Sequence, residues 1–190
     1  MGKWKAADGV RKTLRERLLE TALFLFRKQG YDATSTREIA EEVGASKANV
    51  YHHFRTKDGL LHALLDPLFE EVEALLDRHE PAPNGSPEQR AILEEYFDLV
   101  LENRELVSML ASDMAVLSHP EIGQRTLELN DRLLELVAGS EAGVEGQVRA
   151  ACALGSLQTV AVRFFQADEK AIREAGLRAA LGALGVEGSS

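Results

Sequence analysis

The sequence predicts an all-α fold, and three observations favour it. Ala, Leu and Glu are abundant whereas Val and Ile are few, which favours helices over strands. No stretch alternates strongly between apolar and polar residues, as a half-buried strand would. Three of the five prolines fall within 81–87, so long uninterrupted helices are possible on either side of that segment.

A first helix is expected over about 10–29, after a disordered arm at 1–9. Its apolar residues recur at spacings of three and four and therefore share one helix face. These residues are Leu14, Leu18, Ala22, Leu25 and Phe26. Gly30 is placed to end the helix, because glycine readily adopts the backbone conformation that follows a helix C-terminus.

Residues 36–57, TREIAEEVGASKANVYHHFRTK, predict two short helices around a glycine turn. Ser35 can cap the first helix, and Glu38 completes a capping box. Gly44 makes the turn, and Ser46 can cap the second helix, which ends near His53. This order of elements is that of a helix-turn-helix, which places its second helix in the major groove of DNA.

The rest of the chain predicts a helical body. Thr56 caps a long helix that ends near Arg78, in which Pro67 is expected to cause a kink. EPAPNGSP, at 80–87, predicts a linker. Further helices are expected at 87–102, 104–114, 119–138, 144–165 and 169–184, about nine in all. The predicted domains are 1–56, a three-helix helix-turn-helix domain, and 57–190, a helical body.

The charges are distributed unevenly along the chain. The net charge is −9, which taken alone argues against a nucleic-acid partner. However, residues 1–66 hold 12 Lys and Arg against 9 Asp and Glu, whereas residues 67–190 hold 10 against 22. A positive head of +3 on a body of −12 fits a small nucleic-acid-binding domain attached to another domain.

Cysteine content and hydropathy indicate a cytoplasmic protein. Cys152 is the only cysteine, which excludes an intrachain disulfide and favours a reducing compartment. The first residues lack the apolar segment of a signal peptide. No apolar run approaches the ~18 residues that a membrane span requires, so no membrane partner is expected.

The second short helix has the residue types that base recognition needs. Val50 and Phe54, at i and i+4, can anchor its inner face. Lys47 can donate to guanine, Asn49 can pair with adenine, and the small Ala48 permits a close approach to a thymine methyl. The full set of predicted DNA contacts is Thr36, Arg37, Ser46, Lys47, Ala48, Asn49, Tyr51, His52, His53 and Lys57.

These residues also have simpler interpretations. A single lysine, asparagine or histidine is more commonly a solvated surface residue, and only the set on one exposed face predicts DNA contact. Tyr51 could pack against the first helix instead. A metal site at His52 and His53 is not expected, because adjacent helical residues point about 100° apart and no carboxylate or cysteine cluster accompanies them. Lys3, Lys5, Arg11 and Lys12 could reach the minor groove or have no role.

The segment 13–65 resembles the DNA-binding domain of TetR-family transcriptional regulators. The resemblance rests on Gly30-Tyr31, Thr36-Arg37-Glu38-Ile39-Ala40, Gly44, Ser46-Lys47-Ala48-Asn49-Val50-Tyr51-His52-His53-Phe54 and Lys57. It implies that the predicted contact residues occupy the positions with which this family binds DNA. Two departures are Val43, where Ala is common, and Ala48-Asn49 in place of Gly-Thr, so the base preference cannot be transferred.

The resemblance also implies that 57–190 is a helical ligand-binding and dimerisation domain, with a small-molecule effector that binds in it. Candidate pocket residues are Phe97, Met109, Met114, Gln158, Phe164 and Phe165, although ordinary core packing explains each of them as well. Met109 and Met114 have flexible side chains that suit an apolar effector. The identity of the effector does not follow from the sequence.

Residues 144–184 resemble the two C-terminal helices with which such regulators dimerise. Small residues are frequent in the first of these helices and permit close helix packing, either within the fold or across a two-fold axis. A homodimer is expected because one recognition helix reads too few bases, so the predicted DNA partner is a palindromic operator. A monomeric bundle is the alternative.

The predicted function is therefore that of a ligand-responsive, homodimeric repressor. Two alternatives remain: an activator, or a helical small-molecule-binding protein of the same fold that does not bind an operator. An enzyme is not expected, since the sequence has no Glu-x-x-His pair of the di-iron type, nucleophile elbow or phosphate-binding loop. No metal or cofactor is predicted.

Overall fold

The computed structural model describes residues 12–139, 142–164 and 166–186, and these residues form ten helices and no strand. The helices are α1 (Leu14–Gln29), α2 (Thr36–Val43), α3 (Lys47–His53), α4 (Lys57–Arg78), α5 (Pro87–Glu102), α6 (Arg104–Ser112), α7 (Met114–Leu117), α8 (Pro120–Ala138), α9 (Val144–Arg163) and α10 (Glu169–Ala183). The predicted all-α class is confirmed. The arm predicted at 1–9 lies outside the described residues.

One helix more than the predicted nine is present, because the helix predicted at 104–114 ends at Ser112 and the short α7 follows at Met114–Leu117. Asp113 has an extended backbone, with φ −101° and ψ 101°, which ends α6. Its carboxylate accepts hydrogen bonds from the N–H groups of Ala115 and Val116 and so caps the four-residue α7. The sequence prediction missed this break because Asp113 interrupts no apolar spacing.

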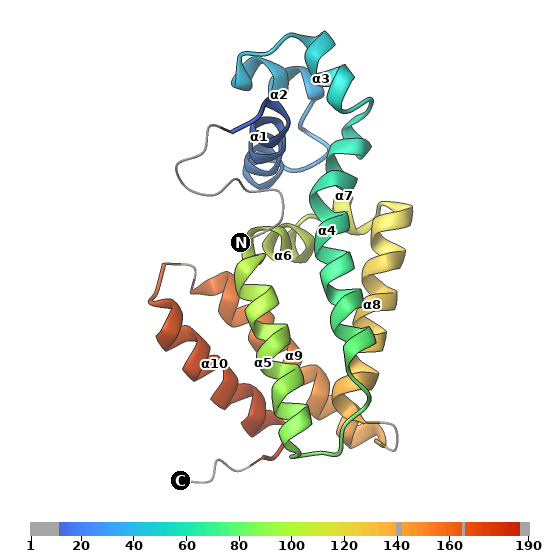
Figure 1. Ribbon diagram of the computed structural model, residues 1–190, viewed down its shortest axis with the longest axis vertical. Coiled ribbons are helices and arrows are strands. Elements are labelled where there is room, and N and C mark those ends of the chain that lie inside the picture. The colour runs from blue at the N-terminus through green and yellow to red at the C-terminus, as the bar shows by residue number, and fades with distance from the viewer. Residues whose placement is uncertain (1–11, 140–141, 165, 187–190) are drawn as a thin grey trace.

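The first three helices form a small domain at the blue end of the molecule (Figure 1). Their apolar faces meet in a shared core in which Leu18, Leu19 and Ile39 are fully buried. Arg17 of α1 also donates a 2.6 Å hydrogen bond to the backbone oxygen of Val43 at the end of α2. These contacts fix the position of α2 on α1.

The long helix α4 joins this domain to the body (Figure 1). Its buried residues extend over most of its length; they are Leu60, Leu61, Leu64, Leu65, Leu68, Phe69, Val72, Leu75 and Leu76. Pro67, predicted to kink the helix, lies inside it and does not end it. α4 therefore contributes to the hydrophobic cores of both domains.

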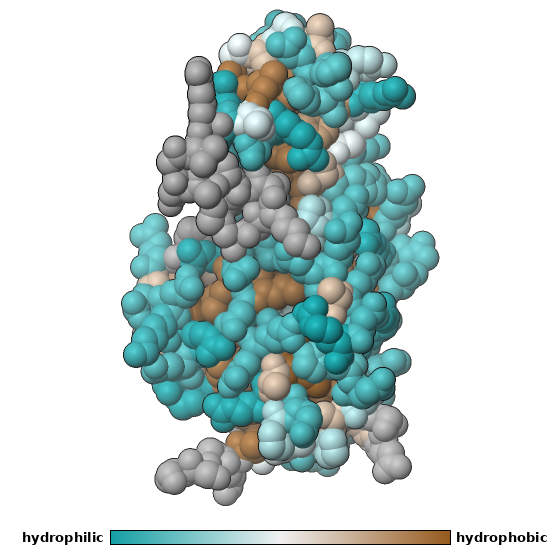
Figure 2. Space-filling view, viewed as in Figure 1, coloured by the Kyte–Doolittle hydropathy of each residue, from teal (hydrophilic) through white to brown (hydrophobic). Residues whose placement is uncertain are grey.

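The body consists of α5 to α10 packed with the second half of α4. α8 lies alongside α4, and α10 lies against α9 and α5 (Figure 1). α10 approaches α5 closely at Gly176, where an added Cβ would come within 2.7 Å of the Phe97 ring. The face seen in Figure 2 is mostly hydrophilic, with apolar residues visible in limited patches. None of the described helices is long and apolar enough to cross a bilayer.

The predicted linker between α4 and α5 is fastened to the body. The Asn84 amide donates to the backbone oxygen of Leu184 at 3.3 Å. Gln89, which is only 1% exposed, donates to the oxygen of Val137 at 2.8 Å and accepts from the N–H of Gly85. The segment therefore closes the end of the body remote from α1–α3.

Candidate nucleic-acid interface

Two serine caps and a glycine turn set the geometry of α2 and α3. The Ser35 hydroxyl accepts from the N–H of Glu38 at 3.2 Å, while the N–H of Ser35 donates to the Glu38 carboxylate at 2.8 Å. These bonds form the predicted capping box, and the Ser35 N–H holds the pKa of Glu38 below its usual value. Gly44 has the left-handed conformation, φ 70° and ψ 31°, and the Ser46 hydroxyl caps α3 through the N–H of Asn49.

The inner face of α3 is anchored as predicted. Val50 is 2% exposed and Phe54 is 6% exposed, and both join the core. On the outer side of Phe54, the guanidinium of Arg15 lies 5.4 Å from the ring centroid. α3 is therefore held at a fixed angle to α1 while its opposite face stays free.

The leading turn and outer face of α3 are open to solvent. The exposed side chains are Ser46, Lys47, Ala48, Asn49, Tyr51, His52 and His53. Tyr51 is 63% exposed, so it does not pack against α1 as one interpretation of the sequence suggested. Seven of the ten predicted contact residues are thus exposed on α3 and its N-cap.

The three remaining predicted residues lie at the borders of this surface. Thr36 is half-buried at the start of α2, and the exposed Arg37 pairs with Glu41 at 2.7 Å, which raises the pKa of Arg37. Lys57, at the start of α4, is half-buried and donates at 2.8 Å to the backbone oxygen of Tyr31. Lys57 therefore has an intramolecular role that the sequence pattern did not reveal.

Arg55 is a cation that the sequence prediction did not assign to this surface. It is exposed and lies between the end of α3 and the start of α4. A basic residue immediately after a recognition helix is the sequence signal that could have identified it. Within the described ranges, no group of three or more His, Cys, Asp or Glu side chains is placed to hold a metal ion, at α3 or elsewhere.

A comparison with protein families identifies the proteins that share this helix-turn-helix. The model described as "Bacterial regulatory proteins, tetR family" matches residues 18–64. This segment of the chain belongs to the TetR family. The matched segment runs from the buried face of α1 into the first half of α4 and includes all ten predicted DNA contacts.

Named relatives agree with the family assignment. The chain is 27% identical over 117 residues to the transposon Tn10 TetC protein of Escherichia coli, a match that covers 62% of this chain and 59% of TetC. It is 43% identical over 53 residues to the HTH-type transcriptional regulator QacR of Staphylococcus aureus, or 28% of each chain. The chain thus spans less than two thirds of the length of these relatives.

Solved structures extend the likeness to the body. The TetR-family regulator PfmR from Thermus thermophilus superposes with a TM-score of 0.68 at 25% identity, over 88% of this chain and 97% of PfmR. AmtR from Mycobacterium smegmatis superposes with a TM-score of 0.57 at 28% identity, over 96% and 90% of the two chains. QacR and PfmR are regulators by name, and none of these four proteins is named as an enzyme.

A TetR-type body was expected to hold a pocket, and the structure contains a cavity of about 260 Å³ lined by residues of α4, α5, α6 and α8, with one residue each from α7 and α9. Of the six predicted pocket residues, Gln158 lines it. Phe97 and Met109 are buried in the core, whereas Met114 is 71% exposed and Phe164 is 56% exposed. Phe165 lies outside the described residues.

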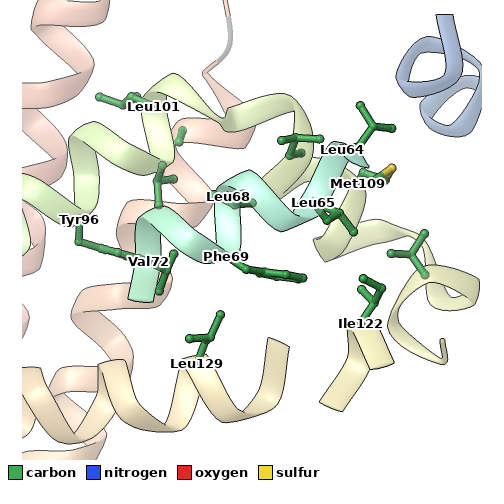
Figure 3. Packing of buried hydrophobic residues seen from close by; sticks show 14 of the residues in the cluster. Leu64, Leu65, Leu68, Phe69, Val72, Tyr96, Leu101, Met109, Ile122 and Leu129 are labelled. Atoms are coloured by element: carbon green, nitrogen blue, oxygen red, sulfur yellow. The ribbon is translucent and has the colours of Figure 1, made fainter. Parts of the chain in front are cut away.

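The walls that the prediction missed come mainly from α4, α5, α6 and α8. Leu68, Phe69 and Val72 of α4 face Leu129 of α8, with Tyr96 of α5 closing one end (Figure 3). α4 carries apolar residues along most of its length, because it packs in both domains. The continuation of its apolar face beyond Pro67 is the sequence signal that could have pointed to α4 as a wall of the cavity.

Proposed function

We propose that the chain is a sequence-specific DNA-binding transcriptional regulator, a ligand-responsive homodimer that acts as a repressor. The observation that carries the proposal is the exposed turn 46–49 of α3, which is held at a fixed angle by Val50 and Phe54. Short side chains at the N-terminus of a rigid recognition helix can reach base edges in the major groove. A regulator of this kind needs access to DNA, so the proposal includes a cytoplasmic location.

The proposed contacts divide into two kinds. Lys47, Ala48 and Asn49 are assigned to base edges, because lysine can donate to guanine and asparagine can pair with adenine. Thr36, Arg37, Ser46, Tyr51, His52, His53 and Lys57 are assigned to phosphates or to base edges at the border of the site. Half or more of protein–DNA hydrogen bonds reach the backbone, so phosphate contacts are expected to outnumber base contacts.

The outward faces of α9 and α10 support the homodimer through 144–184. Exposed residues on α9 include Val144, Val148, Ala151, Cys152 and Thr159, and those on α10 include Ala171, Ala175, Ala179 and Gly182. Val144 and Val148 are 79% and 55% exposed, which is unusual for valine. A face of small and apolar side chains permits a second pair of helices to approach closely. Two recognition helices would then read the two halves of a palindrome.

The cavity supports the response to a ligand. It lies between α4, which enters both domains, and α6 to α8, which belong to the body only. A ligand that prefers one arrangement of these helices shifts α4 and thereby changes the separation of the two recognition helices. Operator and effector affinities are then coupled reciprocally.

The experiment is a fluorescence-anisotropy titration with palindromic fragments that the full chain selects from a random DNA library. The repressor proposal expects a preference over random DNA and a negative slope of log affinity against log salt concentration. A slope near zero, or equal affinity for random DNA, would favour the alternative of a helical small-molecule-binding protein that does not bind an operator. A reporter placed behind the selected operator then separates repression from activation.

A further inference from the structure

The cavity in the body has a mainly apolar lining. Eleven of its fifteen lining residues are Leu, Val, Phe or Ala, and the other four are Tyr96, Thr126, Asn130 and Gln158. Tyr96, Val72 and Leu129 extend from three different helices into the same region (Figure 3). The volume, about 260 Å³, is below the ~300–1,000 Å³ typical of drug-sized pockets, so the space suits a small molecule.

Within the described part of the chain, no charged group lines this cavity. Its lining residues, as far as the structure describes them, include no Asp, Glu, Lys, Arg or His. The nearby guanidinium of Arg125, 5.0 Å from the centroid of the Phe69 ring, forms ion pairs with Asp66 and Glu73. Arg125 is therefore already neutralised by two carboxylates. An ionised ligand would lose its hydration here and gain no counter-charge.

A hydrogen-bonding pair lies in the otherwise apolar wall. Gln158 Nε2 donates to the hydroxyl oxygen of Tyr96 at 2.6 Å, and Tyr96 is only 3% exposed. A tyrosine hydroxyl has one hydrogen to donate, and this bond does not use it. Burial raises the pKa of Tyr96 to about 12, so the hydroxyl keeps that hydrogen at neutral pH.

We infer that the cavity binds a small, uncharged, mainly apolar molecule with one oxygen that accepts a hydrogen bond from Tyr96. A carbonyl, ether or hydroxyl oxygen meets this requirement. That this molecule is also the effector that controls DNA binding rests on the proposed function. Its binding to the cavity does not.

Four compounds built on one ring test the inference by isothermal titration calorimetry of the full chain at neutral pH without DNA. Acetophenone is neutral and has a carbonyl oxygen, ethylbenzene is neutral without one, and benzoate and benzylamine are charged. The expected result is saturable binding of acetophenone, weaker binding of ethylbenzene, and no binding of benzoate or benzylamine. Charged compounds that bind as tightly as acetophenone overturn the inference, as does the absence of saturable acetophenone binding in the millimolar range.

Tyr96→Phe removes the hydroxyl and keeps the ring, so it tests the contribution of the hydroxyl to binding. The variant is expected to bind acetophenone roughly tenfold more weakly and ethylbenzene unchanged. The ethylbenzene value shows whether the cavity has kept its shape. Equal weakening of both compounds, or no weakening of either, contradicts the assigned role of Tyr96.

A second variant tests the location independently of Tyr96. Val107→Phe adds volume to the cavity wall and is expected to abolish acetophenone binding. Its matched control is Leu127→Phe, which makes a similar change at a side chain that is 66% exposed on α8 and outside the cavity lining. If the two variants bind acetophenone equally, the ligand occupies another site.

Parallel operator titrations distinguish this inference from the proposed function. If the chain binds acetophenone but no DNA, the inference about the cavity stands and the proposed function is contradicted. If the chain binds its operator but none of the neutral compounds, the proposed function stands and the inference about the cavity is contradicted. Acetophenone that binds the cavity without changing operator affinity removes only the statement that this class of molecule is the effector.

Discussion

The Asp113 carboxylate accepts a 2.7 Å hydrogen bond from the backbone N–H of Tyr31, although the two residues are 82 positions apart. The other carboxylate oxygen caps α7 through the N–H of Ala115 at 3.0 Å. One side chain thus joins the turn between α1 and α2 to the corner between α6 and α7. Residues of α6 and α7 also line the cavity, so the bond connects the cavity wall to the DNA-binding domain.

Tyr31 transmits this connection to α4. Its hydroxyl donates to the Asp58 carboxylate, and Lys57 donates to its backbone oxygen with the ammonium 4.1 Å from the ring centroid. Burial and then the Asp58 contact raise the pKa of Tyr31, so it remains a neutral donor. A displacement of the α6–α7 corner would therefore reach both the α1–α2 turn and the first turn of α4.

Asp113→Ala should weaken the coupling between the body and the DNA-binding domain. The change leaves the N–H of Tyr31 without its acceptor and α7 without its cap, so the free energy of unfolding should fall by about 1–3 kcal/mol. Urea unfolding measures this loss. The ratio of operator affinities with and without acetophenone should also move toward one.

The matched control is Asp131→Ala, which removes an exposed carboxylate from α8. It should change the free energy of unfolding by less than about 0.5 kcal/mol and leave the affinity ratio unaltered. If Asp113→Ala loses stability but keeps the full affinity ratio, the Tyr31–Asp113 bond is structural only.

Asn49→Ala should relax the sequence preference without unfolding α3. The cap on α3 uses the backbone N–H of residue 49, which alanine retains, and the Asn49 side chain is exposed. The loss of one base contact should cost about 1–3 kcal/mol in discrimination at one position of each half-site. Titration against operators substituted at single positions measures this discrimination, and Glu42→Ala, on the exposed side of α2, should leave it unchanged. Uniform weakening on all sequences would instead assign Asn49 to phosphate.

Lys57→Ala should reduce stability even when no DNA is present. The Lys57 ammonium donates to Tyr31 and lies over its ring, and both contacts are lost, so about 1 kcal/mol of unfolding free energy should be lost. Lys47→Ala, at an exposed position, should change stability by less than about 0.5 kcal/mol. Because Lys57 is also proposed to contact phosphate, its variant should flatten the log–log salt slope by about one. Equal stability of the two variants would contradict the structural role of Lys57.

The local part of this structure could be predicted from the sequence, because its causes are local. The caps at Ser35 and Ser46 and the turn at Gly44 depend on residues at most three positions apart, and all three lie where the pattern placed them. The buried side of α3 also follows from spacing, since Val50 and Phe54 share a face. The helix-turn-helix could therefore be recognised from its sequence alone.

The body could be predicted less well, because its cavity depends on how helices are rotated against one another. Met114 has the residue type of a pocket lining, yet it lies on the surface, because Asp113 ends α6 and redirects the chain. Tyr31 and Asp113 meet across two domains, and no sequence spacing indicates such a contact. Apolar spacing identifies the buried side of a helix but not the helix that it packs against.

Gly155→Lys should convert the proposed homodimer to monomers without unfolding the protomer. An added Cβ at Gly155 meets no atom within 4 Å, so the single chain can accommodate a side chain on this part of α9. Across a two-fold axis the same lysine would meet its own copy, and two like charges would be buried where small residues had allowed close packing. Sedimentation velocity should show a dimer for the original chain and a monomer for the variant, with unchanged helical circular dichroism. Leu127→Lys introduces the same side chain on the exposed face of α8 and should leave the dimer intact. If both variants sediment as dimers, the interface lies elsewhere than on the outward face of α9.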